Sequence, residues 1–231
     1  MTLTSDELQQ LLRRSALLDA ALIRFVPAHF KGVSDRVASS RIMCGVGFEH
    51  AESVKILITN DNFTSAISLL RLQYEALVRA VWLQYAASDK VTQRLMGEFT
   101  HEKAKQADRL SMMTQMLQEL EGKAPSDIMN LLLQFKEYSW KPLSSYVHGG
   151  IHVLNRHSKG YPPFLIHQAV RASNSVSIIL AMHLAQISGE PKQMLLLSTL
   201  QVTFADCLLE SHAQTVAKHL IIKPVKRNTE Q

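Results

Sequence analysis

The sequence predicts an all-α protein, a single-domain bundle of about seven helices. Apolar residues recur with a period near 3.6 along almost the whole chain, and no alternating run of β-branched residues is long enough for a convincing strand. No linker rich in Pro, Gly or Ser divides the 231 residues, and no internal repeat is evident. We therefore expect residues 1–231 to form one helical domain.

Each expected helix is bounded by a cap or a turn signal. Thr4 and Glu7 form a capping box, the cluster "NDNFTSA" caps the third helix, and Gly122 closes the fourth. Pro142 introduces a further helix that carries "SSYVHGG", and Pro191 opens the last one. The other boundaries place helices at about 5–27, 34–60, 63–88, 89–121, 126–138, 164–188 and 191–221.

Composition narrows the classes of protein that fit. The first residues, "MTLTSDELQQLLRR", are polar and acidic where a signal peptide would be basic and then apolar, and the lipophilic stretch "VSIILAMHLAQI" has 12 residues where about 20 span a bilayer. The two cysteines, Cys44 and Cys207, match neither a disulfide framework nor a zinc spacing. We expect a cytoplasmic protein with no membrane contact.

The net charge of +5 raises the possibility of nucleic-acid binding, but the charge is unevenly spread. Residues 211–231 hold four basic side chains and one acidic one, a local charge of +3, so all that precedes them carries +2. We expect residues 223–231 to be a disordered basic tail.

The most informative segment is "SLLRLQYEALVRAVWLQYAA", residues 68–87, which is apolar around most of its circumference. Three charged residues, Arg71, Glu75 and Arg79, lie four apart, so they form one narrow row along the helix. The row could be an ion-pair ladder that faces solvent. Alternatively it points toward another polar segment, in which case Glu75 is largely buried against one or both arginines.

The segment "SSYVHGGIHVL", residues 144–154, is the best partner for that row. His148 and His152 are four apart, with Ser145 on the same face if the helix continues. Two adjacent glycines, Gly149 and Gly150, cost a helix about 1 kcal/mol each, which suggests that a neighbouring helix or a ligand approaches His148 closely.

Together the two segments would form an anion-binding pocket. Arg71 and Arg79 would hold phosphate or carboxylate oxygens, and Glu75 would orient an arginine or a histidine. His148 would transfer the proton, because its reference pKa lies nearest neutrality. The side chains expected to contact the substrate are Ser145, Tyr146, Lys141 and His152.

The helix pattern R-x3-E-x3-R-x2-W, which ends at Trp82, and the later S-x2-H-G of residues 145–149 resemble bacterial all-helical families that are distantly similar to the HEPN superfamily. That resemblance implies a homodimer and a metal-independent ribonuclease, an effector of toxin–antitoxin or phage-defence systems that needs no cofactor. HEPN ribonucleases carry R-x4-6-H, whereas this chain has Lys141, six residues and His148. One of the two arginines would therefore have to replace the family's planar guanidinium.

Two other interpretations fit the same residues. His148, His152 and Glu75 could bind a metal, but the arginines would repel a cation and no H-E-x-x-H pattern is present, so we expect no metal. The chain could instead be a non-catalytic interaction or regulatory module that binds a protein encoded in the same operon. In that case "LSMMTQMLQEL" would be an apolar partner surface.

Overall fold

The computed structural model describes residues 5–26, 32–97 and 112–210, which form helices joined by short turns and loops. The described residues form nine α-helices and two short 3-10 helices and contain no strand, which confirms the all-α prediction with slightly more helices than the seven expected. In chain order the elements are α1 (Ser5–Leu22), η1 (Ile23–Phe25), α2 (Asp35–Thr59), α3 (Phe63–Tyr85), α4 (Asp89–Met96), α6 (Met113–Leu120), α7 (Ser126–Val147), α8 (Ile151–Lys159), α9 (Pro163–Ser188), α10 (Pro191–Thr203) and η2 (Ala205–Cys207).

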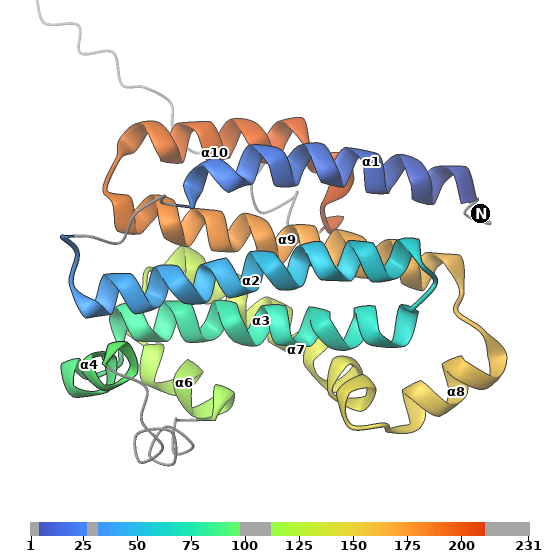
Figure 1. The fold of residues 1–231 in the computed structure, drawn as a ribbon, viewed down its shortest axis with the longest axis horizontal. Helices are drawn as coiled ribbons and strands as arrows, with labels where there is room; N and C mark the ends of the chain where they lie inside the picture. Colours follow the sequence, from blue (N-terminus) through green and yellow to red (C-terminus); the bar gives the residue numbers. More distant parts are fainter. Residues whose placement is uncertain (1–4, 27–31, 98–111, 211–231) are drawn as a thin grey trace, which may run out of the picture.

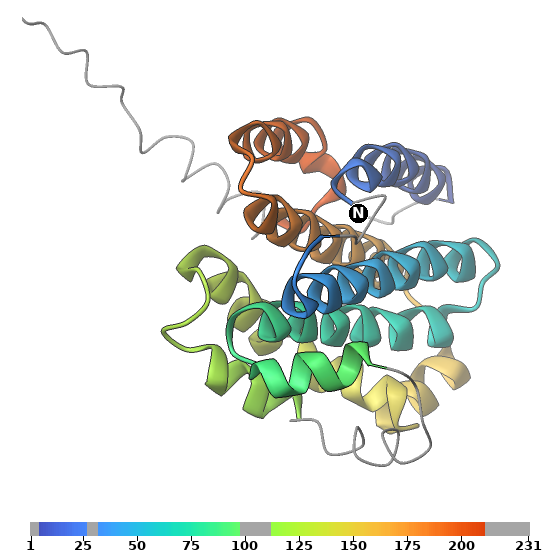
Figure 2. The same ribbon diagram turned by 60° about the vertical axis from the view of Figure 1, so that its left-hand side comes forward.

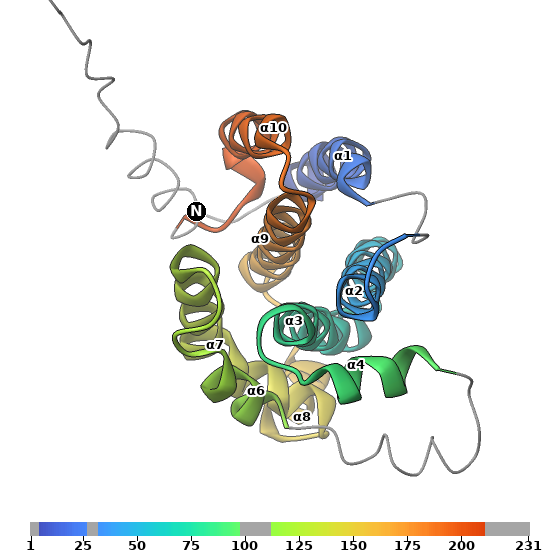
Figure 3. The same ribbon diagram turned by 90° about the vertical axis from the view of Figure 1, so that its left-hand side faces the viewer.

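Helix α9 is the centre of the bundle. Every residue from 172 to 185 is buried, and a helix without a solvent-exposed face must be surrounded by other elements. It contacts α1, α2, α3, α7 and α10, which encircle it in the end-on view of Figure 3. Pro163 at its first turn and Gly189 in the left-handed conformation after its last turn set the two ends.

The helices around α9 give the molecule two distinct sides. Helices α1 and α10 cover one side of α9, whereas the closely packed pair α2 and α3 lies on another (Figures 2 and 3). Helix α8 lies beyond one end of α3, at the far side of the molecule from α10, and α6 lies toward the other end of α3 (Figure 1). Within the described residues, no helix has the length and apolar character needed to cross a bilayer.

Three expected helix boundaries were wrong. The helix expected over 89–121 is divided into α4 and α6, and the 98–111 segment between them lies outside the described residues. The helix expected over 191–221 ends at Thr203, because Phe204 and Cys207 turn inward and are buried. The capping residue Thr4 and the tail at 223–231 also lie outside the described residues.

The third wrong boundary is at Pro142, which lies inside α7 instead of opening a new helix. Proline removes one N–H group and normally breaks a helix through its clash with the preceding turn. Here Pro142 and Tyr138, the residue four positions earlier, are both exposed, so water can reach the carbonyl that lost its partner. The helix therefore continues for five more residues and delivers Val147 and His148 to the surface.

The two glycines end α7. His148 is its C-cap, Gly149 has φ +63°, and the N–H of Gly150 donates to the carbonyl of Ser145 at 2.7 Å. This is a Schellman ending, which requires the left-handed residue that glycine supplies most cheaply. Consequently His148 and His152 belong to different helices, and the prediction that they share one helical face was wrong.

The expectation that the glycines admit a neighbouring helix beside His148 was also wrong. A Cβ atom added at Gly149 would meet nothing within 4 Å. One added at Gly150 would lie 2.5 Å from Oγ of Ser145, a residue of the same turn. The glycines therefore allow the chain to fold back on its own preceding helix, and they leave His148 exposed.

Candidate functional site

The charged row on α3 begins with an ion pair. Nε of Arg71 donates to Oε1 of Glu75 at 2.9 Å, and the two side chains are 12% and 28% exposed. Glu75 is therefore half-buried against one arginine, as the pocket interpretation requires, although it is less buried than expected. The charged row is therefore not fully exposed to solvent, because other elements cover Arg71.

Arg71 connects this row to the end of α7. Its Nη1 lies 3.0 Å from Nε2 of His148, and its guanidinium lies 4.2 Å above the centre of the Trp140 ring. Because a guanidinium can only donate, Nε2 of His148 accepts, and the ring proton is then on Nδ1. The contact thus holds a neutral imidazole at the surface with its basic nitrogen directed at a cation.

Arg79 extends the site along α3. It lines a hollow of about 270 Å³ together with Arg71, Glu75 and Trp140, and the start of α6 at Met112 closes one side. The Nε of Arg79 is buried without a hydrogen-bond partner among the described residues. Because the Arg79 side chain lines the hollow, an anion that enters it would meet a second guanidinium beside that of Arg71.

The remaining predicted residues lie apart from this pair. Oγ of Ser145 accepts the N–H of His152 at 3.1 Å, so it caps the first turn of α8. The buried Tyr146 ring stacks on His152 at 6.1 Å, and burial raises the pKa of Tyr146. Lys141 is exposed on α7, and no hydrogen bond or ion pair in the described part of the chain joins it to Arg71 or His148.

Two sets of residues near the site were missed by sequence reasoning. The first is Trp140, whose ring packs against the guanidinium of Arg71. In the sequence it is recognisable only as an aromatic residue one turn before Ser144 and Ser145. A second hollow, of about 280 Å³, lies between the start of α3 and the end of α8, where Arg156, His157 and Tyr161 line it. The basic last turn of α8 was visible in the sequence, but its proximity to α3 depends on the turn at residues 148–150.

A different histidine site lies in the core. Oγ of Ser40 donates to the carbonyl of Ala80 at 2.7 Å, so it can only accept from Nε2 of His183, which lies 2.9 Å away. His183 is fully buried, and that burial lowers its pKa to about 4. This histidine is a neutral structural group inside the bundle.

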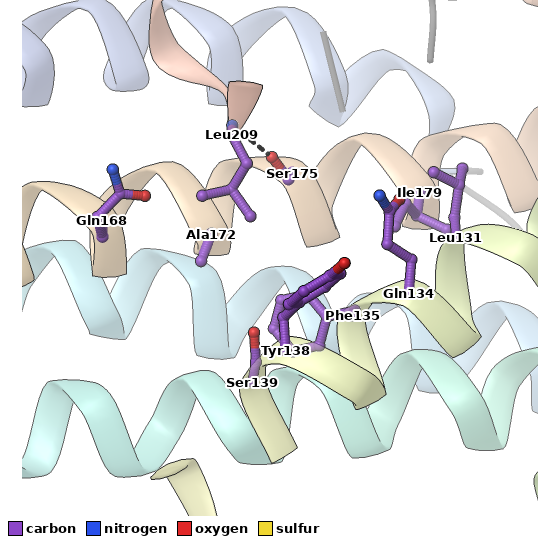
Figure 4. A pocket seen from close by; sticks show the side chains of 10 residues that line it. All are labelled: Leu131, Gln134, Phe135, Tyr138, Ser139, Gln168, Ala172, Ser175, Ile179 and Leu209. Carbon is purple, nitrogen blue, oxygen red and sulfur yellow. Dashed lines mark hydrogen bonds between the residues drawn. The ribbon is translucent and has the colours of Figure 1, made fainter. Parts of the chain in front are cut away.

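The groove between α7 and α9 contrasts with the charged site. Ten uncharged side chains line its volume of about 370 Å³, as Figure 4 shows. Tyr138 lies on one wall, and the N–H of Leu209 donates to Oγ of Ser175 on the other. This groove offers no charge to an anion, so the arginines on α3 remain the better candidate for a functional site.

The fold and these contacts define an all-helical protein with an arginine–histidine pair and a cationic hollow on one face. Within the described residues, no group of three or more His, Cys, Asp or Glu side chains is placed to hold a metal ion. The model of DUF6988, a family of unknown function, matches residues 44–210, and the chain belongs to that family. No curated protein and no solved structure matches the chain.

Proposed function

We propose that this protein is a metal-independent ribonuclease of HEPN-like type, an effector of a bacterial toxin–antitoxin or phage-defence system that acts in the cytoplasm. The observation that carries the proposal is the hydrogen bond between Nη1 of Arg71 and Nε2 of His148. Arg71 is a cation that can hold a phosphate, and His148 is a neutral base at the surface. Metal-independent RNA cleavage needs both groups, and this hydrogen bond joins them.

The chemistry follows from the acceptor that Arg71 prefers. A phosphate oxygen is a stronger partner for a guanidinium than a neutral imidazole, so a bound phosphodiester would displace Nε2 of His148. The freed Nε2 would take the proton of the ribose 2′-hydroxyl as that oxygen attacks phosphorus. The bond to the 5′-oxygen then breaks, the leaving oxygen takes a proton from solvent, and a 2′,3′-cyclic phosphate remains.

Glu75 and Trp140 are positioning residues in this scheme. The carboxylate binds Nε of Arg71, and the indole lies against the face of the guanidinium. With Nε bound to Glu75, Nη1 of Arg71 is directed at Nε2 of His148. Arg79 would stabilise negative charge from the adjoining hollow as the phosphorane-like transition state forms.

A homodimer is part of the proposal. Three large apolar side chains are exposed on α8 and in the first turn of α9: Ile151 is 74%, Leu154 69% and Phe164 65% exposed. Such a group of exposed apolar residues is typical of an interaction surface. A single species near 26 kDa in light scattering at micromolar concentration would contradict the dimer.

The same apolar residues support the second candidate, a non-catalytic module that binds a protein encoded in the same operon. The two functions differ in what His148 does. A module needs no base at that position, so its partner affinity would survive a His148→Ala substitution.

The deciding experiment is incubation of purified protein with total RNA in EDTA, with His148→Ala and His50→Ala beside it. His50 is the matched control, since it is a half-buried histidine on α2 that lines neither the Arg79 hollow nor the Arg156 hollow. We expect wild type and His50→Ala to cleave and His148→Ala to lose at least about a hundredfold in rate. Equal cleavage by all three proteins, or by none, would contradict the ribonuclease proposal.

A further inference from the structure

Two hollows lie along α3: Arg71 lines the first hollow, and the second lies toward the start of the helix. One contains Arg79 and Trp140, and the other contains Arg156, His157 and Tyr161. Thr64, in the second hollow, is seven residues before Arg71, and Arg79 is eight residues after it. These spacings bring all three to one face of the helix.

This strip of α3, from Thr64 to Arg79 with a hollow at each end, forms a track whose length follows from the spacing of its residues. At 1.5 Å per residue, Thr64 lies about 10 Å before Arg71, and Arg79 lies about 12 Å beyond it. Thr64 and Arg79, at the outer ends of the two hollows, are thus about 22 Å apart along the axis, and Arg71, which contacts His148, lies between them. A compact ligand such as free phosphate would occupy one hollow only, whereas an extended polymer could reach both.

The residue types identify the polymer. Each hollow combines an arginine with a half-buried aromatic ring, Trp140 in one and Tyr161 in the other. Proteins that bind single-stranded nucleic acids combine basic groups for the backbone with aromatic rings for the bases.

The charge along the track is modest. Three arginines face two carboxylates, because Glu75 lies between Arg71 and Arg79 and Asp61 lines the second hollow. Arg71 and Glu75 are already paired, which leaves Arg79 and Arg156 to carry most of the attraction for phosphates. Binding should therefore depend strongly on these two side chains and on salt.

We propose that the substrate is a single-stranded nucleic acid whose backbone follows α3 from the Arg79 hollow, past the Arg71–His148 pair, to the Arg156 hollow. This inference rests on the proposed function, because it assigns the substrate class of the same site. It adds Arg156, His157 and Tyr161 to the site, and it places the scissile phosphate within the strand and not at its end.

The test is fluorescence anisotropy with a fluorescein-labelled eight-nucleotide strand of deoxythymidine. This strand lacks the 2′-hydroxyl, so binding is measured whether or not the protein cleaves RNA. The variants are Arg79→Gln and Arg156→Gln, and the control is Lys192→Gln, an exposed basic residue on α10 at the opposite side of the molecule (Figure 1). Circular dichroism checks that each variant folds. If Arg79→Gln does not fold, the test rests on Arg156→Gln.

We expect each arginine variant to bind about tenfold more weakly than wild type. The slope of log affinity against log salt should fall by about 0.7 per charge removed, and Lys192→Gln should bind as wild type. Absence of binding by wild type, equal loss in all three variants, or tighter binding of a duplex of the same length would overturn the inference. Strand binding without RNA cleavage in EDTA would contradict the ribonuclease alone, and cleavage without strand binding would contradict the track alone.

Discussion

His148 and His183 are two neutral histidines that this fold uses in opposite ways. His183 donates through Nε2 to Ser40 inside the core, and burial lowers its pKa to about 4. His148 accepts through Nε2 from Arg71 at an exposed helix end. The difference teaches that the tautomer and the accessibility of a histidine, and not its presence in a helical polar row, distinguish a buried structural group from one that a ligand can reach.

The largest expected effect is on stability, in the core. His183→Ala removes a fully buried ring and its hydrogen bond to Ser40, so we expect a loss of about 3 kcal/mol in the free energy of unfolding. His148→Ala should change it by less than about 0.5 kcal/mol, because the ring is exposed. Urea denaturation followed by circular dichroism measures both. Similar losses in the two variants would show that His148 is structural as well.

The second prediction concerns acid stability. The pKa of His183 is about 4 in the folded state and 6.5 in the unfolded chain, so the unfolded chain binds the proton first. The stabilisation is complete above pH 6.5 and is lost as the pH falls toward 4, by at most about 1.4 kcal/mol per pH unit. His183→Gln keeps a donor for Ser40 and cannot titrate there. Its unfolding free energy should vary less over this interval, and the same slope in both proteins would be evidence against a buried neutral His183.

A smaller effect is expected at the turn that exposes His148. Gly149 has φ +63°, so Gly149→Ala should cost about 1 kcal/mol, whereas Gly149→Asn should cost less because asparagine tolerates this conformation. The sensitive measurement is hydrogen exchange of the His152 amide, which bonds Ser145 across the turn. Exchange that is equally fast in wild type and Gly149→Ala would mean that the turn does not hold α8 in place.

A small effect on stability, between those of Gly149→Ala and His148→Ala, is expected at Arg71. Arg71→Lys keeps the charge but cannot bond Glu75 and His148 at once while lying flat on Trp140, so we expect a loss of about 0.5 to 1 kcal/mol. The RNA cleavage rate should nevertheless fall as far as in His148→Ala. Retention of full cleavage by this variant would show that a point charge suffices and that the fixed guanidinium is not needed.

Much of the fold was predictable because helical periodicity is a local signal. The apolar circumference of α3 predicts a helix buried on most sides, and α3 is buried on most sides in the structure. Pro142 misled the prediction, because whether a helix tolerates proline depends on water reaching the turn before it. That exposure is a property of the packed bundle and not of the local sequence.

The site was predictable in part. Spacing by four residues gives the Arg71–Glu75 pair directly, and the polarity of residues 144–152 correctly indicated a partner for it. The orientation of that partner was not predictable, because a single left-handed residue, Gly149, moves His152 away from His148. Trp140 and Arg156 could not be assigned to the site, because their proximity to α3 comes from tertiary packing.

The most direct test of the account is the imidazole nitrogen NMR spectrum, recorded with and without the eight-nucleotide deoxythymidine strand. Before addition, His148 should show a proton on Nδ1 and His183 a proton on Nε2. The strand should shift the Nε2 resonance of His148, because phosphate replaces that nitrogen as the acceptor for Arg71, and it should leave His183 unchanged. An unchanged His148, or a shift of equal size at His183, would contradict the claim that the Arg71–His148 pair is where this protein meets its substrate.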